Sequence, residues 1–300
     1  MKNFLVTTPI KESYGPSSKN VFLGAWCFDN VQDIKKNKII NYHWSNKKKF
    51  KEDGLYIDRM AEKLCRFLSK QLNKIHNLTE APEYWKLLIY PWTHHYVATV
   101  YDRWESIKIF LKHNKNKVIY SYELDINETN FTPINHADFI ENTYKDVWNY
   151  LIFLRILKFY KLKNIKFIKK KFKYSNNIQD NFFPKEERNF FDYLILLYEK
   201  IFSKFAFKFN KVIIESFSFP KKKFLEISFK NLLFPSFYQI LFKDEGSKKD
   251  LNFEKRVSDL NKTKEKNNDK FYEFLIQNLI NDLPMSYFEN FLKSKKKMSL

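Results

Sequence analysis

Short apolar runs rich in β-favouring residues alternate along the chain with longer stretches in which apolar residues recur every three or four positions. The runs at 3–8 and 21–27 are bounded by Pro, Gly and Ser, so we expect buried strands there. Further strands are expected at 39–44, 118–122 and 211–215. The helical period predicts helices over residues 55–76, 91–111, 135–156, 189–207 and 271–292. Together these elements predict an α/β protein with an open sheet, in which ligands bind at the carboxyl ends of the strands.

The charge pattern divides the chain into three parts. Residues 244–270 are charged and poor in apolar side chains, and Gly246 marks a turn, so we expect an exposed connection there. This connection separates an α/β domain, residues 1–243, from a C-terminal helical segment, residues 271–300.

Arg103 lies on the apolar face of the central helix, seven residues after Tyr96 and four before Ile107. A guanidinium on a buried face is costly unless a carboxylate or an anionic ligand satisfies it. One interpretation is a structural ion pair with Asp102 or another acid. The other is that Arg103 faces a cleft and binds phosphate or carboxylate, with His95 and Asp102 beside it.

The net charge of the chain is compatible with several kinds of anionic binding partner. The chain has 300 residues, a formal net charge of +20 and a pI near 9.6. This charge would attract nucleic acid, an anionic membrane surface or phosphorylated substrates. Almost all of the excess is Lys, and no recognition motif accompanies it, so nucleic acid is not favoured. The Lys-rich stretch at 158–173 is expected to be a solvated edge, with peripheral contact to an anionic membrane as the alternative.

Several classes of protein are not supported by the sequence. Cys27 and Cys65 are too few for a disulfide framework or a zinc site, which fits a reducing cytoplasm. The four Gly are scattered, so no phosphate-binding loop or dinucleotide fingerprint can be written. No stretch reaches the roughly 18 apolar residues that a membrane span needs. We therefore expect a cytoplasmic protein with no metal and no bound cofactor.

Six motifs follow one another in a distinctive order: FLGAWC at 22–27, YHW at 42–44, LNKIH at 72–76, EYWKLLIYPW at 83–92, YDRW at 101–104 and DVWN at 146–149. In this order they resemble the N-terminal half of a family of transferases found in bacterial surface-carbohydrate and O-antigen gene clusters. The resemblance covers residues 3–157 and, more faintly, 283–291. Ala25, Ser45 and Asn46 stand where the family more often has other residues, and the His-Gly-Gly stretch of its second half has no counterpart.

The resemblance implies a Rossmann-like open, mostly parallel sheet flanked by helices, similar to the N-terminal, acceptor-side domain of a two-domain (GT-B-like) glycosyltransferase. It implies a nucleotide-activated sugar and a carbohydrate acceptor as substrates. It also implies a truncated enzyme whose second half is absent or is a separate chain. Two alternatives remain open: a non-catalytic module that docks on a separate catalytic half, and a basic nucleic-acid-binding protein.

If the chain is a glycosyltransferase, the chemistry of its side chains assigns roles to individual residues. Glycosyl transfer needs a base for the acceptor hydroxyl and positive groups for the departing phosphate. His136 and His43 are the candidate bases, because imidazole titrates near neutrality, and Arg103 would hold phosphate. The candidates for stacking on a sugar are Trp26, Trp44 and Trp85. Asn135 is expected to cap a helix whose N-terminus would hold an anion. Each of these residues also has a purely structural interpretation, as a core or loop-fixing side chain.

Overall fold

The computed structural model describes residues 3–172 apart from 17–19, 29 and 38, together with residues 250–261 and 268–298 and four isolated helical positions at 194, 197, 226 and 230. Met1–Asp180 and Gly246–Leu300 belong to one compact unit. The strand expected at 211–215 and nearly all of the helix expected at 189–207 lie outside the described residues.

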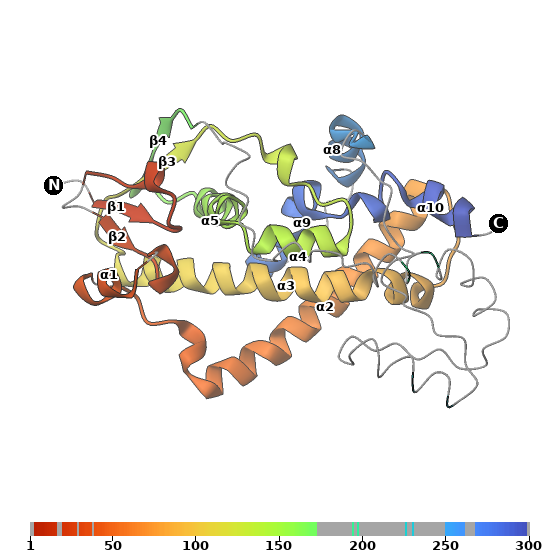
Figure 1. Ribbon diagram of the computed structural model, residues 1–300, viewed down its shortest axis with the longest axis horizontal. Coiled ribbons are helices and arrows are strands. Elements are labelled where there is room, and N and C mark those ends of the chain that lie inside the picture. Colours follow the sequence, from red (N-terminus) through yellow and green to blue (C-terminus); the bar gives the residue numbers. More distant parts are fainter. Residues whose placement is uncertain are drawn as a thin grey trace. The chain divides into compact units, whose positions relative to one another are not determined.

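Four parallel strands form an open sheet in the order β2-β1-β3-β4 (Figure 1). The strands are β1 (Asn3–Val6), β2 (Asn20–Phe22), β3 (Ile119–Leu124) and β4 (Ile165–Lys170). The expected open, parallel sheet flanked by helices is therefore confirmed. The chain leaves β1 toward β2 and later crosses back to β3, so the strand order reverses between β1 and β3. Open α/β sheets bind their ligands beside such a reversal, at the carboxyl ends of the strands.

Three of the expected strands are shorter than their apolar runs, including β1, which ends at Val6. β2 ends at Phe22, and a 3-10 helix, η2 (Ala25–Cys27), follows it. The run at 39–44 contributes one isolated bridge, between Ile39 and Phe22, before the 3-10 helix η3 (His43–Ser45). The expectation of a strand at 39–44 was therefore wrong, because its polar end turns away to contact side chains on the helices.

The described part of the chain contains eight helices. They are α1 (Val31–Lys36), α2 (Lys47–His76), α3 (Pro82–His113), α4 (His136–Thr143), α5 (Asp146–Tyr160), α8 (Phe253–Asn261), α9 (Lys270–Asp282) and α10 (Phe291–Met298). Of these, α8 and α10 lie at the end away from the sheet (Figure 1). The helix expected over 135–156 is two helices, because the chain turns between Thr143 and Asp146. None of these helices combines the length and the apolar character that crossing a membrane requires.

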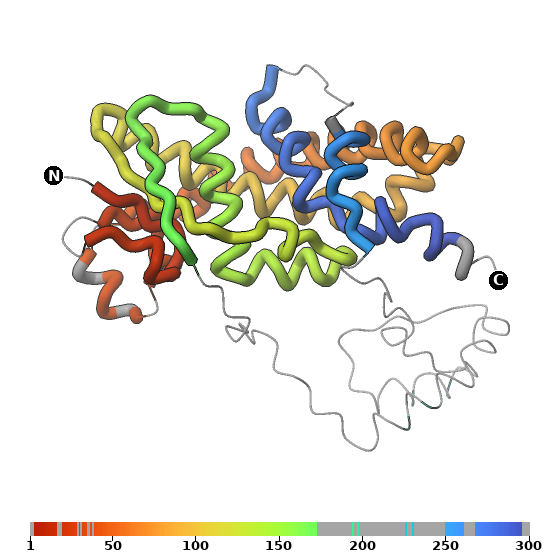
Figure 2. The backbone as a smooth tube through the Cα atoms, turned by 90° about the horizontal axis from the view of Figure 1, so that it is seen from above, coloured from red at the N-terminus to blue at the C-terminus, as the bar shows by residue number. Residues whose placement is uncertain are grey.

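α3 is the central helix and runs from the neighbourhood of α10 to the sheet (Figures 1 and 2). It begins at Pro82, nine residues before the start expected from Pro91, and continues through Pro91. Pro91 removes one hydrogen-bond donor, but it is exposed, and Leu87, whose carbonyl loses that donor, is 81% exposed. The carbonyl can therefore be solvated. The other face of α3 is fully buried and includes Trp85 and Trp92.

The C-terminal helices complete the core. The Tyr96 hydroxyl donates to the Leu275 carbonyl at 3.1 Å, and the Trp148 indole donates to Asp282 at 3.2 Å. α8 lies inside the segment expected to be an exposed connection, and its Arg256 is fully buried. That expectation was wrong for residues 253–261, because Arg256 forms an ion pair with Glu289.

Candidate functional site

A group of polar and aromatic side chains gathers beside the carboxyl ends of β1 and β2. We call Trp26, Tyr42, His43, Asp102 and Arg103 the edge cluster. Trp26 is placed by its indole N–H, which donates to the Thr7 carbonyl just after β1 at 3.0 Å. Its ring lies directly on Gly24, where an added Cβ atom would be 2.3 Å from the ring. The sequence therefore needs Gly24 for Trp26 to fold back over the strand end.

Trp26 and Tyr42 expose their rings to solvent at this edge. Trp26 is 38% exposed and Tyr42 is 40% exposed. Their ring centroids lie 6.1 Å apart, and the angle between the ring planes is 78°. Behind them, Trp26 is parallel to Phe153 of α5 at 6.5 Å. Large aromatic side chains that stay exposed beside polar groups are typical of recognition surfaces. This pair is the exposed aromatic face of the edge cluster.

His43 lies between two carboxylates and is buried. Its Nε2 is 3.0 Å from Asp102 Oδ1, its Nδ1 is 3.8 Å from Asp53 Oδ2, and its side chain is 1% exposed. The Tyr42 hydroxyl donates to the same Asp102 oxygen at 2.7 Å. Because both ring nitrogens face carboxylates and the ring is covered, His43 is placed to orient Asp102.

Asp102 stays ionised despite its burial. Burial alone raises the pKa of Asp102, but hydrogen bonds from His43 and Tyr42 and the charge of Arg103 outweigh it and hold the pKa below its ordinary value. The ion pair between Arg103 and Asp102 that the sequence allowed is present. Arg103 Nε and Nη2 also donate to Asn149 Oδ1 of α5, at 3.0 and 2.9 Å. The Arg103 side chain nevertheless remains 22% exposed at the surface of the cluster.

Trp44 belongs to a neighbouring structural network. Its indole N–H donates to Asp53 at 3.0 Å, and Lys49 bridges Asp53 to Glu105 at 2.9 Å from each carboxylate. These contacts fasten η3 to α2 and α3. Among the described residues, no group of three or more His, Cys, Asp or Glu side chains has a metal-binding arrangement.

His95, His136 and Asn135 lie further toward the start of α3. The rings of His95 and His136 are 5.8 Å apart and nearly perpendicular. Burial and the nearby His94 and Arg103 lower the pKa of His95, and burial and His95 lower the pKa of His136. The Nε2 atom of His136 is buried and has no hydrogen-bond partner in the described part of the chain.

The remaining two candidates have structural roles. Asn135 caps α4, as expected, and its side chain accepts from the Asp138 amide at 2.9 Å. Trp85 is fully buried and donates to Asn73 at 2.7 Å, so it is a core residue and lies away from the edge cluster. Tyr42 and Asn149 were missed as site residues, although both belong to the motifs YHW and DVWN.

The described residues thus place two partly exposed aromatic rings and an ion pair beside the carboxyl edge of an open parallel sheet, the edge at which such sheets bind ligands. A model of the LIC12162 family transferases matches residues 3–300, so the chain belongs to this family of transferases. The comparison with curated proteins and the comparison with solved structures give no match.

Proposed function

We propose that this transferase transfers a glycosyl group from a nucleotide-activated sugar to a carbohydrate acceptor in the synthesis of a surface polysaccharide. Family membership supports group transfer. The observation that carries the glycosyl assignment is the pairing of exposed Trp26 and Tyr42 rings with the Tyr42–Asp102–Arg103 chain of contacts. Aromatic faces suit the apolar face of a sugar ring, and polar groups beside them suit its hydroxyls.

Arg103 supplies the positive charge of the proposed site. Asp102 and Asn149 hold its guanidinium in one orientation, so little reorganisation accompanies binding. In the transfer step, the acceptor hydroxyl oxygen forms a bond to the anomeric carbon while the bond from that carbon to the phosphate oxygen breaks. Arg103 then stabilises the negative charge that develops on the departing phosphate.

His136 is the proposed base. Its lowered pKa keeps the imidazole neutral near pH 7, and because Nε2 is buried, Nδ1 is the atom proposed to accept the proton of the acceptor hydroxyl. His43 receives a positioning role instead, because it is buried against Asp102. His136 and His43, which were equal candidates for the base from the sequence, therefore have different proposed roles: His136 is the base, and His43 positions Asp102.

The test is donor cleavage by the purified full-length chain. A panel of nucleotide-activated sugars is incubated with and without oligosaccharide acceptors, and the released nucleoside diphosphate is measured. We expect His136→Gln to reduce turnover by about 10²-fold or more, and Trp26→Ala to weaken acceptor use. Tyr90→Ala is the matched control, because Tyr90 is a partly buried aromatic residue of α3 whose ring pairs with His94, outside the cluster. Equal activity of all three variants would remove Trp26 and His136 from the reaction.

A further inference from the structure

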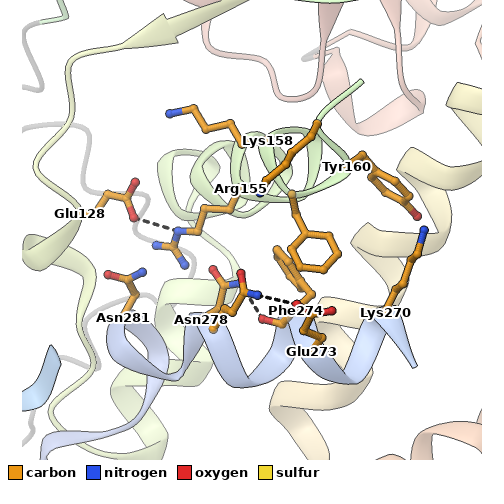
Figure 3. A pocket seen from close by; sticks show the side chains of 12 residues that line it. Glu128, Arg155, Lys158, Tyr160, Lys270, Glu273, Phe274, Asn278 and Asn281 are labelled. Atoms are coloured by element: carbon orange, nitrogen blue, oxygen red, sulfur yellow. Dashed lines mark hydrogen bonds and ion pairs between the residues drawn. The ribbon is translucent and has the colours of Figure 1, made fainter. Parts of the chain in front are cut away.

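Two adjoining hollows follow the side of α5 that faces away from the edge cluster. One has a volume of about 560 Å³ and lies between the end of α5 and α9 (Figure 3). The other has a volume of about 440 Å³ and lies at the carboxyl ends of β3 and β4. Glu128 and Lys158 line both hollows, so the hollows are neighbours, and we call the two together the lysine groove.

The lysine groove is separate from the edge cluster. Asn149 and Phe153 of α5 contact Arg103 and Trp26, whereas Leu154, Arg155 and Lys158 of the same helix line the groove. The groove therefore uses a different face of α5. Its size, summed over the two hollows, lies in the range of small-molecule sites.

Positive charge dominates the groove. Two of its acids are already neutralised, since Glu123 accepts from Lys158 at 2.7 Å and Glu128 accepts from Arg155 at 2.9 Å. Four lining lysines have no ion pair with any residue in the described part of the chain: Lys161, Lys169, Lys171 and Lys270. Only two further lining acids, Asp125 and Glu273, oppose them. The free ammonium groups outnumber the free carboxylates, which favours an anionic ligand.

The two ends of the groove differ in chemistry. Lys169 and Lys171 lie at the carboxyl end of β4, the edge of a parallel sheet at which ligands bind. At the other end, Tyr160 supplies partly exposed aromatic surface, and Asn278 lies beside the buried ring of Phe274 (Figure 3). The lysine end suits a phosphate group, and the aromatic end suits a planar ring with polar edges.

We propose that the lysine groove binds a small molecule that carries a phosphate or diphosphate beside a planar ring, the chemistry of a nucleotide. The phosphates lie among Lys169 and Lys171, and the ring lies toward Tyr160. This site goes beyond the proposed function, because it is built from residues outside the edge cluster and needs no transfer reaction to be detected.

The test is calorimetric titration of the full-length chain with uridine diphosphate, guanosine diphosphate and inorganic pyrophosphate. We expect at least one nucleoside diphosphate to bind more tightly than pyrophosphate. Lys169→Ala/Lys171→Ala should weaken binding of all three probes by about tenfold or more. Tyr160→Leu should weaken nucleoside diphosphates and leave pyrophosphate unchanged.

The matched control is Lys163→Ala/Lys166→Ala, which removes two exposed lysines near the start of β4 that do not line the groove. It changes the net charge by the same amount, so we expect affinity within about twofold of the original chain. Absence of binding to every probe would overturn the proposal. Equal weakening by the two double variants would also overturn it, because attraction would then come from the net charge of +20 alone.

Discussion

Asn149 of α5 accepts two hydrogen bonds from the guanidinium of Arg103 on α3, one from Nε and one from Nη2. Its side-chain amide also donates to the carbonyls of Thr143 and Lys145, at 2.8 and 3.0 Å. One side chain therefore fixes the orientation of Arg103 and holds the turn between α4 and α5. This arrangement links the exposed cation of the edge cluster to the helix junction behind it.

Asn149→Ala should lower the free energy of unfolding by about 1.5–3 kcal/mol, because Arg103 Nε and Nη2 and the Thr143 carbonyl lose the bonds they make with Asn149, while the Lys145 carbonyl keeps its bond from the backbone N–H of residue 149. Urea denaturation of the variant and the original chain measures the difference. The control is Asn281→Ala, since Asn281 is partly exposed in the first hollow and is not in the edge cluster. A loss no larger than that of the control would show that Asn149 does not stabilise the junction.

Gly24→Ala should displace Trp26 from the carboxyl edge of β1. The new methyl group would lie 2.3 Å from the indole ring, so the ring or the backbone must move. We expect unfolding to become easier by about 1–3 kcal/mol and the tryptophan fluorescence to change. Loss of carbohydrate acceptor use in the same variant would connect Trp26 to the proposed function.

Gly54→Ala is the contrasting substitution. Gly54 lies inside α2, and nothing is within 4 Å of the position of an added Cβ atom. Alanine should therefore stabilise the chain by about 0.5–1 kcal/mol through helix propensity. Thermal unfolding of both variants gives the test, because the two changes are expected to have opposite signs. A destabilised Gly54→Ala variant would mean that α2 is constrained there by something other than helix propensity.

Periodicity was sufficient to predict elements that depend on local sequence and one buried face. The apolar stripe that includes Tyr96 and Ile107 predicted the buried face of α3, and both residues are fully buried. Asn135 was predicted to cap a helix because an N-cap depends only on neighbouring amides. Short apolar runs separated by helices predicted an open α/β sheet, whereas its parallel order was expected from the family resemblance.

The remaining features depend on contacts between residues far apart in the chain. The burial of His43 follows from Asp102, which is 59 residues away, so the YHW motif alone could not separate a base from a positioning residue. The lysine groove combines β3, β4, α5 and α9, none of which is recognisable as a site by itself. Tertiary placement thus determined which polar residues remain accessible.

Arg256 is a further example, because a charged segment concealed a fully buried guanidinium. Arg256 Nε donates to Glu289 at 2.8 Å, Nη2 pairs with the same carboxylate, and Nη1 donates to the Leu283 carbonyl at 2.6 Å. Arg256→Ala should therefore cost about 3–5 kcal/mol, since Glu289 is left buried without a counter-charge. Lys255→Ala, at an exposed neighbouring position of α8, should change stability little. Guanidinium chloride unfolding distinguishes the two, and similar stabilities would rule out a structural role for the Arg256–Glu289 pair.

The His95–His136 pair should make stability depend on pH. Both residues have a folded-state pKa below the ordinary value of 6.5, whereas the unfolded chain keeps the ordinary value. As the pH falls below 6.5, the unfolded chain takes up protons first, so the free energy of unfolding should fall. The window begins near that value and extends down to the lowered pKa values.

Urea denaturation across this window should show a smaller fall for His95→Asn/His136→Asn than for the original chain. His113→Asn, at the exposed end of α3, should retain the original dependence. If the double variant keeps the full dependence, the pair is not its source.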